Sequence, residues 1–289
     1  MWTPQDSIGN HARALHRRPP HAHLLKRHTI CCMPAPTFHR YVALGDSFTE
    51  GVGDPDPDRP NGLRGWADRV AEVLNAQTPD FGYANLAIRG RKMASILDEQ
   101  LAPAIALRPD LVSIYSGAND LLRPKVDIDA LVASYTEGIK ALSATGATIV
   151  LFTAYDPGIS LIFKPVRGRM AIYNEGVREI ADETGALIVD MWRMRDVPPY
   201  AIWDDDRMHL NAGGHQHIAR AVLDRLGIEH QLPVPPVPPP PQRTAAEARQ
   251  EHFQWAKEHA APWVHRRLTG RSSGDNVQPK RPTLGPISS

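Results

Sequence analysis

Three short segments, far apart along the chain, carry side chains that could together perform acyl transfer. They are Gly45-Asp46-Ser47-Phe48, Gly117-Ala118-Asn119-Asp120 and Asp206-Arg207-Met208-His209. Ser47 supplies a hydroxyl, Asn119 an amide, Asp206 a carboxylate and His209 an imidazole, the minimum set for chemistry by a serine nucleophile. One such tetrapeptide would carry little information, but the three in this order indicate a serine-based acyl transfer.

A serine hydroxyl becomes a useful nucleophile only when a base takes its proton. Of the 13 histidines, six lie in residues 1–40 and three in the C-terminal region, which leaves His209, His215, His217 and His230. His215 and His217 fall on a predicted helix, and His230 faces the linker. His209 lies in the loop before that helix, three residues after Asp206. This spacing lets Asp206 bond one ring nitrogen while the other points at a hydroxyl, so we predict His209 as the base.

Five apolar runs alternate with helix-period segments between residues 41 and 227. The predicted strands are Arg40–Leu44, Tyr83–Ala87, Leu111–Tyr115, Thr148–Thr153 and Leu187–Met191. Near-continuous apolar strands separated by helices are typical of a parallel sheet covered on both faces. Right-handed crossovers then give a three-layer α/β/α domain. Ser47, Gly90 and Asn119 follow the first three strands, so we expect them at the carboxyl edge where such sheets bind ligands.

Over roughly residues 40–227 the chain resembles the SGNH hydrolase superfamily, the GDSL-type esterases and lipases. The resemblance implies a five-stranded, flavodoxin-like parallel sheet and hydrolysis of small-molecule carboxylic esters through an acyl-enzyme. It assigns the nucleophile and one oxyanion-hole amide to Ser47, a second amide to Gly90 and the side-chain donor to Asn119. Asp206 and His209 become the acid and base of the triad, with no metal and no cofactor.

A few residues depart from the family's usual pattern. Phe48 replaces a leucine, Arg89 and Arg91 flank the glycine, and Leu210 stands where many members have proline. None of these changes removes a reacting group. Two carboxylates near the blocks, Asp46 and Asp120, are predicted to be structural, Asp46 by bonding backbone amides of the following turn or helix.

Two other segments resemble motifs of different chemistry but lack their essential parts. Residues 270–274 match G-x-S-x-G but lack the strand and helix that this elbow needs. Residues 45–53 lack the Gly-Lys-Ser/Thr of a phosphate loop and carry Asp46 and Glu50, which would repel phosphate. A non-enzymatic interaction protein on an idle fold is a rival hypothesis. Among enzymes, a soluble esterase, an interfacial lipase and a carbohydrate deacetylase stay open.

The charge distribution is uneven although the net charge is only +1. Residues 1–40 carry six Lys and Arg against one Asp, and residues 242–289 carry eight against four, so the centre is acidic. Neither tail has a run of five like charges, so we expect solvated ends and no nucleic-acid partner. The sequence shows no membrane span and no secretory signal. Cys31 and Cys32 are adjacent and give no disulfide framework, so we predict a cytoplasmic protein.

Composition divides the chain into five parts. We predict a disordered basic tail over residues 1–38 with an alternative start at Met33, and a hydrolase domain over residues 39–230. A Pro-rich linker follows over residues 231–243, then a helical segment over residues 244–268 and a disordered tail over residues 269–289. Seven prolines within residues 233–241 predict an extended spacer, rather than a ligand for an SH3-like protein partner.

The segment after the linker has the signals of a short helix. Thr244 and Glu247 form a capping box, and Pro262 is expected to break or kink the helix. An apolar stripe is expected to pack on the chain's own domain and could cover the crevice; it consists of Phe253, Ala256, Ala260 and Trp263. Residues 159–163 are a second hydrophobic stretch, which forms either a pocket wall or lid or an ordinary packed loop.

Overall fold

The computed structural model describes residues 36–160 and 163–287. The chain divides into two units, Met1–Pro34 and Ala35–Ser289, and the second holds all the elements described. The predicted basic tail therefore lies almost entirely outside the described residues. Phe38, at its end, is buried in the core of the second unit.

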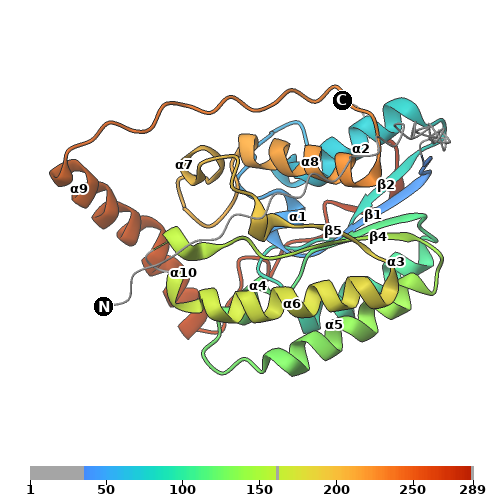
Figure 1. Ribbon diagram of the computed structural model, residues 1–289, viewed down its shortest axis with the longest axis horizontal. Coiled ribbons are helices and arrows are strands. Elements are labelled where there is room, and N and C mark those ends of the chain that lie inside the picture. The colour runs from blue at the N-terminus through green and yellow to red at the C-terminus, as the bar shows by residue number, and fades with distance from the viewer. Residues whose placement is uncertain (1–35, 161–162, 288–289) are drawn as a thin grey trace, which may run out of the picture. The chain divides into compact units, whose positions relative to one another are not determined.

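A six-stranded sheet forms the centre of the second unit (Figure 1), in the order β5-β4-β3-β1-β2-β6. Strands β1 to β5 are parallel and have the flavodoxin-like order, as predicted. Their bounds are β1 Arg40–Leu44, β2 Gly82–Asn85, β3 Leu111–Ile114, β4 Thr148–Phe152 and β5 Leu187–Val189. Strand β6, Arg281–Gly285, runs antiparallel to β2 and was not predicted.

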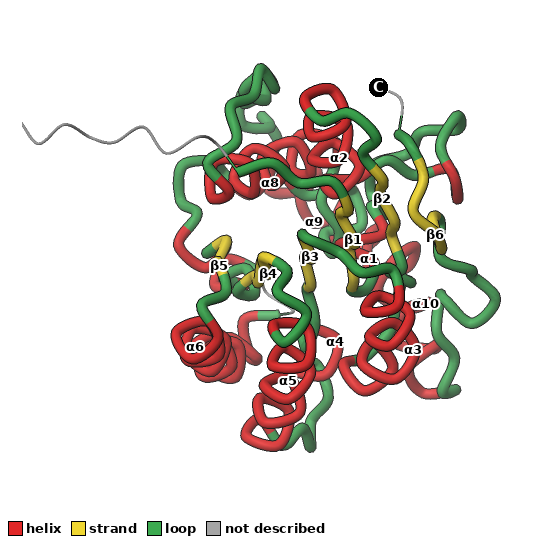
Figure 2. Tube along the Cα trace, turned by 90° about the vertical axis from the view of Figure 1, so that its right-hand side faces the viewer, coloured by secondary structure: helices red, strands yellow, loops and turns green. Residues whose placement is uncertain are grey.

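Helices cover both faces of the sheet (Figure 2), which gives the predicted three layers. One face carries α2 and α8, and the other carries α3, α5 and α6. Short helices follow strands or lie in loops, and two more helices come near the C-terminus. The bounds are α1 Ser47–Glu50, α2 Gly65–Gln77, α3 Met93–Ala106, α4 Ala118–Leu121, α5 Ile128–Ser143, α6 Arg167–Thr184, α7 Pro199–Ile202, α8 Ala212–Leu226, α9 Ala245–Trp255 and α10 Ala261–Leu268.

The central strand β1 explains why the strands read as continuous apolar runs. Tyr41 and Ala43 point to the layer of α2 and α8, whereas Val42 and Leu44 point to the layer of α3, α5 and α6. All four side chains are fully buried. Because side chains alternate across a strand, a strand buried on both faces needs an apolar residue at every position.

Residues with clear local roles fix the ends of the helices next to the site. The Asn211 side chain accepts a hydrogen bond from Gly214 N and caps the start of α8. Gly227 ends α8 in the left-handed conformation, as predicted. From there the chain runs as an extended segment to α9 (Figure 1), and no helix or strand occurs in residues 228–244. The predicted capping box of Thr244 and Glu247 is present at the start of α9.

The prediction of a disordered tail over residues 269–289 is wrong for the segment around β6. Lys280 and Asp68 form an ion pair at 2.9 Å, and both side chains have no exposed surface. Burial lowers the pKa of Lys280, opposed by the charge of Asp68. The Lys280 ammonium also donates to the Arg64 carbonyl at 2.6 Å. This anchor joins positions far apart along the chain, so the polar composition of the tail gave no sign of it.

The apolar stripe of the C-terminal helices was only partly predicted. Trp263 packs on the domain, with its ring centroid 6.1 Å from that of Phe163, but Phe253 is 76% exposed. The side chain that α9 buries is Trp255, at 8% exposure. A π-helical turn, Ala256–Ala260, precedes Pro262 and rotates the later residues away from the 3.6-residue spacing. The proline thus distorts the helix, as predicted, without breaking it.

Within residues 36–160 and 163–287, no helix has both the length and the apolar composition that crossing a membrane requires.

We predict that the Lys280–Asp68 pair contributes strongly to stability. Among residues 36–160 and 163–287, Lys280→Met leaves the buried Asp68 carboxylate with the Tyr83 hydroxyl as its one remaining donor, at 2.9 Å. The free energy of unfolding in urea should fall by about 3 kcal/mol. Lys125→Met, at an exposed position, is the control and should unfold at the wild-type midpoint. Equal midpoints for both variants would show that the C-terminal strand is not anchored by this pair.

Candidate active site

Ser47 is placed by a tight turn at the carboxyl end of β1. Gly45 has φ +143°, and a Cβ there would lie 2.7 Å from both Thr49 Oγ1 and the Tyr115 carbonyl, so only glycine fits. The Gln100 side chain clamps this turn from α3. It accepts from Gly45 N at 2.8 Å and donates to Gly45 O at 2.9 Å. The turn therefore presents Ser47 as the first residue of α1 in a fixed position.

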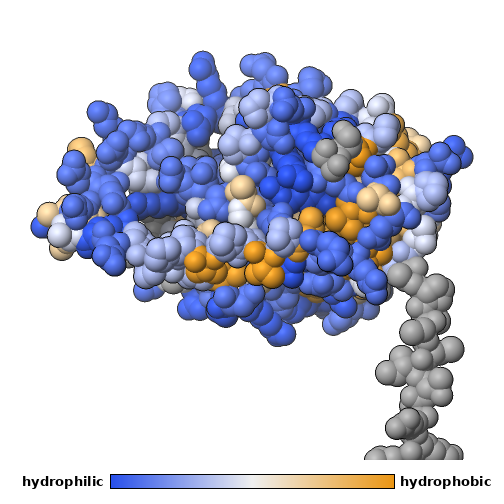
Figure 3. All heavy atoms as spheres, turned by 90° about the horizontal axis from the view of Figure 1, so that it is seen from above, coloured by the Kyte–Doolittle hydropathy of each residue, from blue (hydrophilic) through white to orange (hydrophobic). Residues whose placement is uncertain are grey.

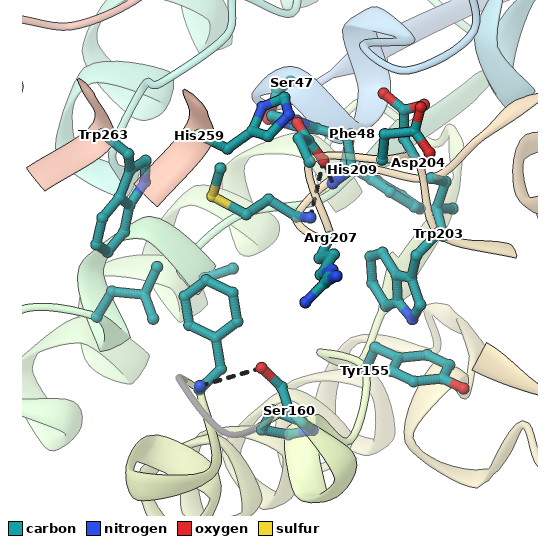
Figure 4. A pocket seen from close by; sticks show the side chains of 18 of the residues that line it. Ser47, Phe48, Tyr155, Ser160, Trp203, Asp204, Arg207, His209, His259 and Trp263 are labelled. Atoms are coloured by element: carbon teal, nitrogen blue, oxygen red, sulfur yellow. Dashed lines mark hydrogen bonds and ion pairs between the residues drawn. The ribbon is translucent and has the colours of Figure 1, made fainter. Parts of the chain in front are cut away.

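The loop before α8 brings an imidazole to this serine (Figure 4). His209 Nε2 lies 3.0 Å from Ser47 Oγ, and His209 Nδ1 lies 2.5 Å from Asp206 Oδ2. The second carboxylate oxygen of Asp206 accepts from the backbone N–H groups of Met208, at 2.8 Å, and His209, at 2.9 Å. The structure thus joins the three side chains that the sequence selected into one chain of hydrogen bonds.

The electrostatics of Asp206 favour one tautomer of His209. Burial alone would raise the pKa of Asp206, but the hydrogen bonds and charge of His209, with the Met208 N–H, lower it to about 2. The carboxylate is therefore ionised near neutral pH and holds a proton on Nδ1. Nε2 is left as the acceptor facing the Ser47 hydroxyl, which is the arrangement that general-base catalysis needs.

The neighbouring histidines have structural contacts instead. His215 is fully buried, accepts from Trp66 N at 3.2 Å and donates to the Val52 carbonyl at 3.1 Å. Burial lowers the pKa of His215 to about 4. His217 faces Asp196, with 3.7 Å between the nearest atoms. Neither ring has Ser47 as a partner, in agreement with the choice of His209 from its place in the chain.

Gly90 lies in the turn after β2, and the contacts of its neighbour Arg89 with Glu50 hold this turn in place. The Arg89 backbone N–H and guanidinium bind the Glu50 carboxylate at 2.7 and 2.5 Å, and the Glu50 side chain is fully buried. Arg91 pairs with Glu99 at 2.8 Å. Both flanking arginines therefore bind the chain's own carboxylates. In the described part of the chain, the backbone N–H groups of Ser47 and Gly90 donate to no protein acceptor.

Asn119 is held beside the serine by a contact that the sequence did not suggest. Its amide donates to Asp46 Oδ2 at 2.9 Å and to the Arg91 carbonyl at 3.1 Å. The other oxygen of Asp46 accepts from Phe48 N at 3.1 Å and caps α1, as predicted. Asp120 accepts from the Met93 N–H at 3.0 Å, at the start of α3, which is a structural role. Both amide protons of Asn119 are thus already committed to acceptors of the protein.

A cavity of about 1780 Å³ opens above these residues. Ser47, Gly90, Asn119 and His209 line it together with aromatic side chains from several loops and from the C-terminal helices, among them Tyr155, Trp203, Trp255 and Trp263. Ser160 and Phe163 also line it, so these residues of the 159–163 stretch form a pocket wall. Leu161 and Ile162 lie outside the described residues. Within the described ranges, no three His, Cys, Asp or Glu side chains are grouped to hold a metal ion.

Residues 43–217 match the sequence profile of the GDSL-like lipase/acylhydrolase family. The chain belongs to this family. An acetylxylan esterase of Geobacillus stearothermophilus is 30% identical over 211 residues, which cover 66% of this chain and 94% of that protein. The chain is therefore a carboxylic ester hydrolase of the GDSL type, and the resemblance noted from its sequence is confirmed.

Solved structures support the same assignment. The crystal structure of an acetylxylan esterase from Geobacillus stearothermophilus has a TM-score of 0.55 and 26% identity, covering 68% of this chain and 98% of that one. An α/β-hydrolase from the metagenome of Lake Arreo in Spain is alike in fold, with a TM-score of 0.55, 23% identity and coverage of 67% and 97%. These proteins match about two thirds of the GDSL-type chain described here.

We predict that Asp46 gives the stability of the enzyme a distinct pH dependence. Burial, opposed by the Phe48 N–H and the charge of His209, raises the pKa of Asp46 to about 7. An unfolded aspartate titrates near about 4, so the folded protein binds the extra proton between these values. The stabilising contribution is complete below about pH 4 and is lost as the pH rises through about 7.

Asp46→Asn tests this dependence, because asparagine keeps an oxygen for the Phe48 N–H but cannot titrate. The free energy of unfolding of the wild type, minus that of the variant, should fall by a few kcal/mol from about pH 4.5 to about pH 8 in urea titrations. Asp98→Asn, at an exposed position, provides the control. A difference that does not change with pH would contradict the prediction.

Proposed function

We propose that this enzyme hydrolyses carboxylic esters through an acyl-enzyme on Ser47, with His209 as base and Asp206 as the residue that orients it. The observation that carries the proposal is the hydrogen-bonded chain from Ser47 Oγ to His209 Nε2 and from His209 Nδ1 to Asp206. An unactivated serine is a poor nucleophile, and this geometry supplies the base that it needs.

The reaction follows from the positions of the protons. His209 Nε2 takes the Ser47 proton as Oγ attacks the ester carbonyl, and the tetrahedral intermediate carries its negative charge on the former carbonyl oxygen. The intermediate collapses when the protonated His209 gives its proton to the leaving alcohol. Water, deprotonated by His209, then releases the acid from Ser47. Asp206 stabilises the imidazolium and does not itself take the proton.

Three donors are proposed to hold the oxyanion, namely the backbone N–H groups of Ser47 and Gly90 and the side-chain amide of Asn119. The first two face no protein acceptor among the described residues, so they can bind the oxyanion without breaking another bond. The Asn119 amide must share or exchange its bond to Asp46 or Arg91. We therefore expect its contribution to arise as negative charge develops in the transition state.

Solved structures of the related acetylxylan esterase agree with this assignment of roles. Three of them are described as catalytic mutants, in which a serine, an aspartate or a histidine is replaced by alanine. The replaced aspartate and histidine are three positions apart, which is also the spacing of Asp206 and His209.

For the substrate class, we propose short acyl esters, with acetyl groups on carbohydrates tested first. The relatives are named as esterases of acetylxylan or of acetyl-xylooligosaccharides. In this chain, the rings of Tyr155 and Trp203 lie edge to face at a centroid distance of 5.2 Å and line the cavity (Figure 4). Such amphipathic rings suit a ligand that has both apolar faces and hydroxyl groups.

An interfacial lipase is the less favoured alternative. The large hydrophobic side chains that are exposed in the described residues are spread over α6, α7, the Pro-rich segment, α9 and α10. Figure 3 shows one face of the molecule as mainly hydrophilic, with a limited band of hydrophobic side chains. Contiguous apolar surface is what binding to a lipid interface would need. The cytoplasmic location, the absence of a nucleic-acid partner, and a spacer rather than a protein-binding role for the Pro-rich segment stay predictions.

Ser47→Ala and His209→Ala should each abolish hydrolysis of p-nitrophenyl acetate, because each removes a group that moves in the reaction. Asn119→Ala should lower kcat by about 100–1,000-fold, as expected for one oxyanion donor. A fluorophosphonate probe should label wild-type Ser47 and leave the Ser47→Ala variant unlabelled. Retained turnover in either of the first two variants would defeat the proposed triad.

A series of p-nitrophenyl esters from acetyl to palmitoyl, with acetylated xylooligosaccharides alongside, tests the substrate class. We expect kcat/KM to be highest for the acetyl ester and acetate to be released from the oligosaccharide. Inactive Ser47→Ala protein is the control for background hydrolysis. A maximum at palmitoyl, together with activation by lipid droplets, would instead favour the lipase.

A further inference from the structure

The Asp206–His209 loop is held by a helix outside the family-matched residues 43–217. The indole N–H of Trp255, the last residue of α9, donates to the Asp206 carbonyl at 2.9 Å. The guanidinium of Arg207 lies 5.2 Å from the centroid of the Trp255 ring. An Arg207 nitrogen is also 2.8 Å from His252 Nδ1, one turn earlier on α9. Three contacts from one helix therefore converge on two consecutive residues of the loop.

Arg207 has an unusual backbone conformation that these contacts can stabilise. Its φ is +55°, in the left-handed region, which is unfavourable for a residue with a side chain and persists only where the surroundings enforce it. Arg207 lies between Asp206 and His209, so this conformation sets the direction of both side chains. Its N–H donates to the Asp204 carbonyl at 2.9 Å, which closes a tight turn.

The Trp255 hydrogen bond is made to a peptide group whose orientation depends on φ of Arg207. The Asp206 carbonyl belongs to the peptide group that joins Asp206 to Arg207. If φ of Arg207 relaxed to negative values, this peptide would rotate and its oxygen would leave the indole N–H. The Trp255 hydrogen bond thus selects the strained conformation in which Asp206 and His209 meet.

The helix that makes these contacts is itself fixed to the domain. Trp255 is buried, and further along the chain Trp263 packs against Phe163. Beyond α10, a Cβ at Gly274 would lie 2.1 Å from the Arg89 carbonyl, so the chain there runs directly against the turn that carries Gly90. The buried Lys280 follows. A helix fastened on its C-terminal side in this way can act as a rigid support.

We propose that Trp255 is a positioning residue for the reaction, which acts by holding the strained peptide between Asp206 and Arg207. The inference rests on the proposed function, because Trp255 acts through Asp206 and His209. It extends the active site to a C-terminal segment that lies beyond residues 43–217, the part that matches the family profile.

Trp255→Phe tests the proposal, because phenylalanine keeps an apolar ring and removes the N–H. We expect kcat for p-nitrophenyl acetate to fall about tenfold with KM little changed, since a displaced catalytic group slows the chemical step. The proton resonance of the His209 Nδ1–H bond to Asp206 should shift or broaden in the NMR spectrum. Phe253→Ala, on the same helix but at a side chain 76% exposed, should leave both measurements unchanged.

An Arg207→Gly background separates positioning from general destabilisation. Glycine adopts positive φ without strain, so Trp255→Phe should lower kcat less in this background than in the wild type. If Trp255→Phe does not fold, His252→Ala at an exposed position replaces it, with an expected decrease in kcat of about threefold. Equal losses in both backgrounds, or wild-type kcat and resonance in Trp255→Phe, would overturn the proposal.

The two proposals can fail separately. Absence of Ser47-dependent hydrolysis in the wild type would reject the proposed function. The His209 resonance would still report whether Trp255 holds the loop, because it needs no substrate. Normal hydrolysis with a Trp255→Phe variant that matches the wild type in rate and resonance would reject the positioning role alone.

Discussion

The hydrogen bond between Ser47 and His209 joins positions 162 apart in the sequence, and the rest of the fold serves to keep those two side chains in contact. Because β1 to β5 are parallel, the loops that follow their carboxyl ends all lie at one edge of the sheet. This arrangement places Ser47, after β1, near Asn119, after β3. Helix α8 packs on α2 on the same face of the sheet, and the loop entering α8 delivers His209. A small change in how these two helices pack would move His209 relative to Ser47, the proposed base and nucleophile.

Carboxylates near the site have different properties because each faces a different set of donors. Asp206 receives hydrogen bonds from His209 and backbone amides and stays ionised, which suits the support of an imidazolium. Asp46 is more deeply buried, and burial raises its pKa. Its two oxygens accept hydrogen bonds from the Phe48 N–H and the Asn119 amide, which fixes the start of α1 and orients Asn119. Glu50 is neutralised by Arg89 and fixes the turn of Gly90. The sequence predicted different roles for Asp46 and Asp206, but the donors that set their pKa values, and the Glu50–Arg89 pair, are visible only in the folded structure.

Features that depend on local residue patterns and short motifs could be predicted from the sequence. The five parallel strands, the capping box at Thr244 and the contact of His209 with a serine hydroxyl followed from spacing and composition. Contacts between distant parts of the chain could not be predicted in this way. The bond from Trp255 to Asp206 joins residues 49 positions apart and has no local signature in the sequence. The Lys280–Asp68 pair likewise needs a tertiary fold to be visible.

Strand β6 also protects one edge of the central sheet from pairing with other molecules. It occupies the outer side of β2, whose N–H and C=O groups would otherwise face solvent. Unpaired strand edges are templates for strands of other molecules. A chain that ended before β6 would expose that edge and leave the buried Asp68 carboxylate without the Lys280 ammonium. Such a chain would tend to associate edge to edge, so β6 protects the hydrolase domain from pairing with other copies.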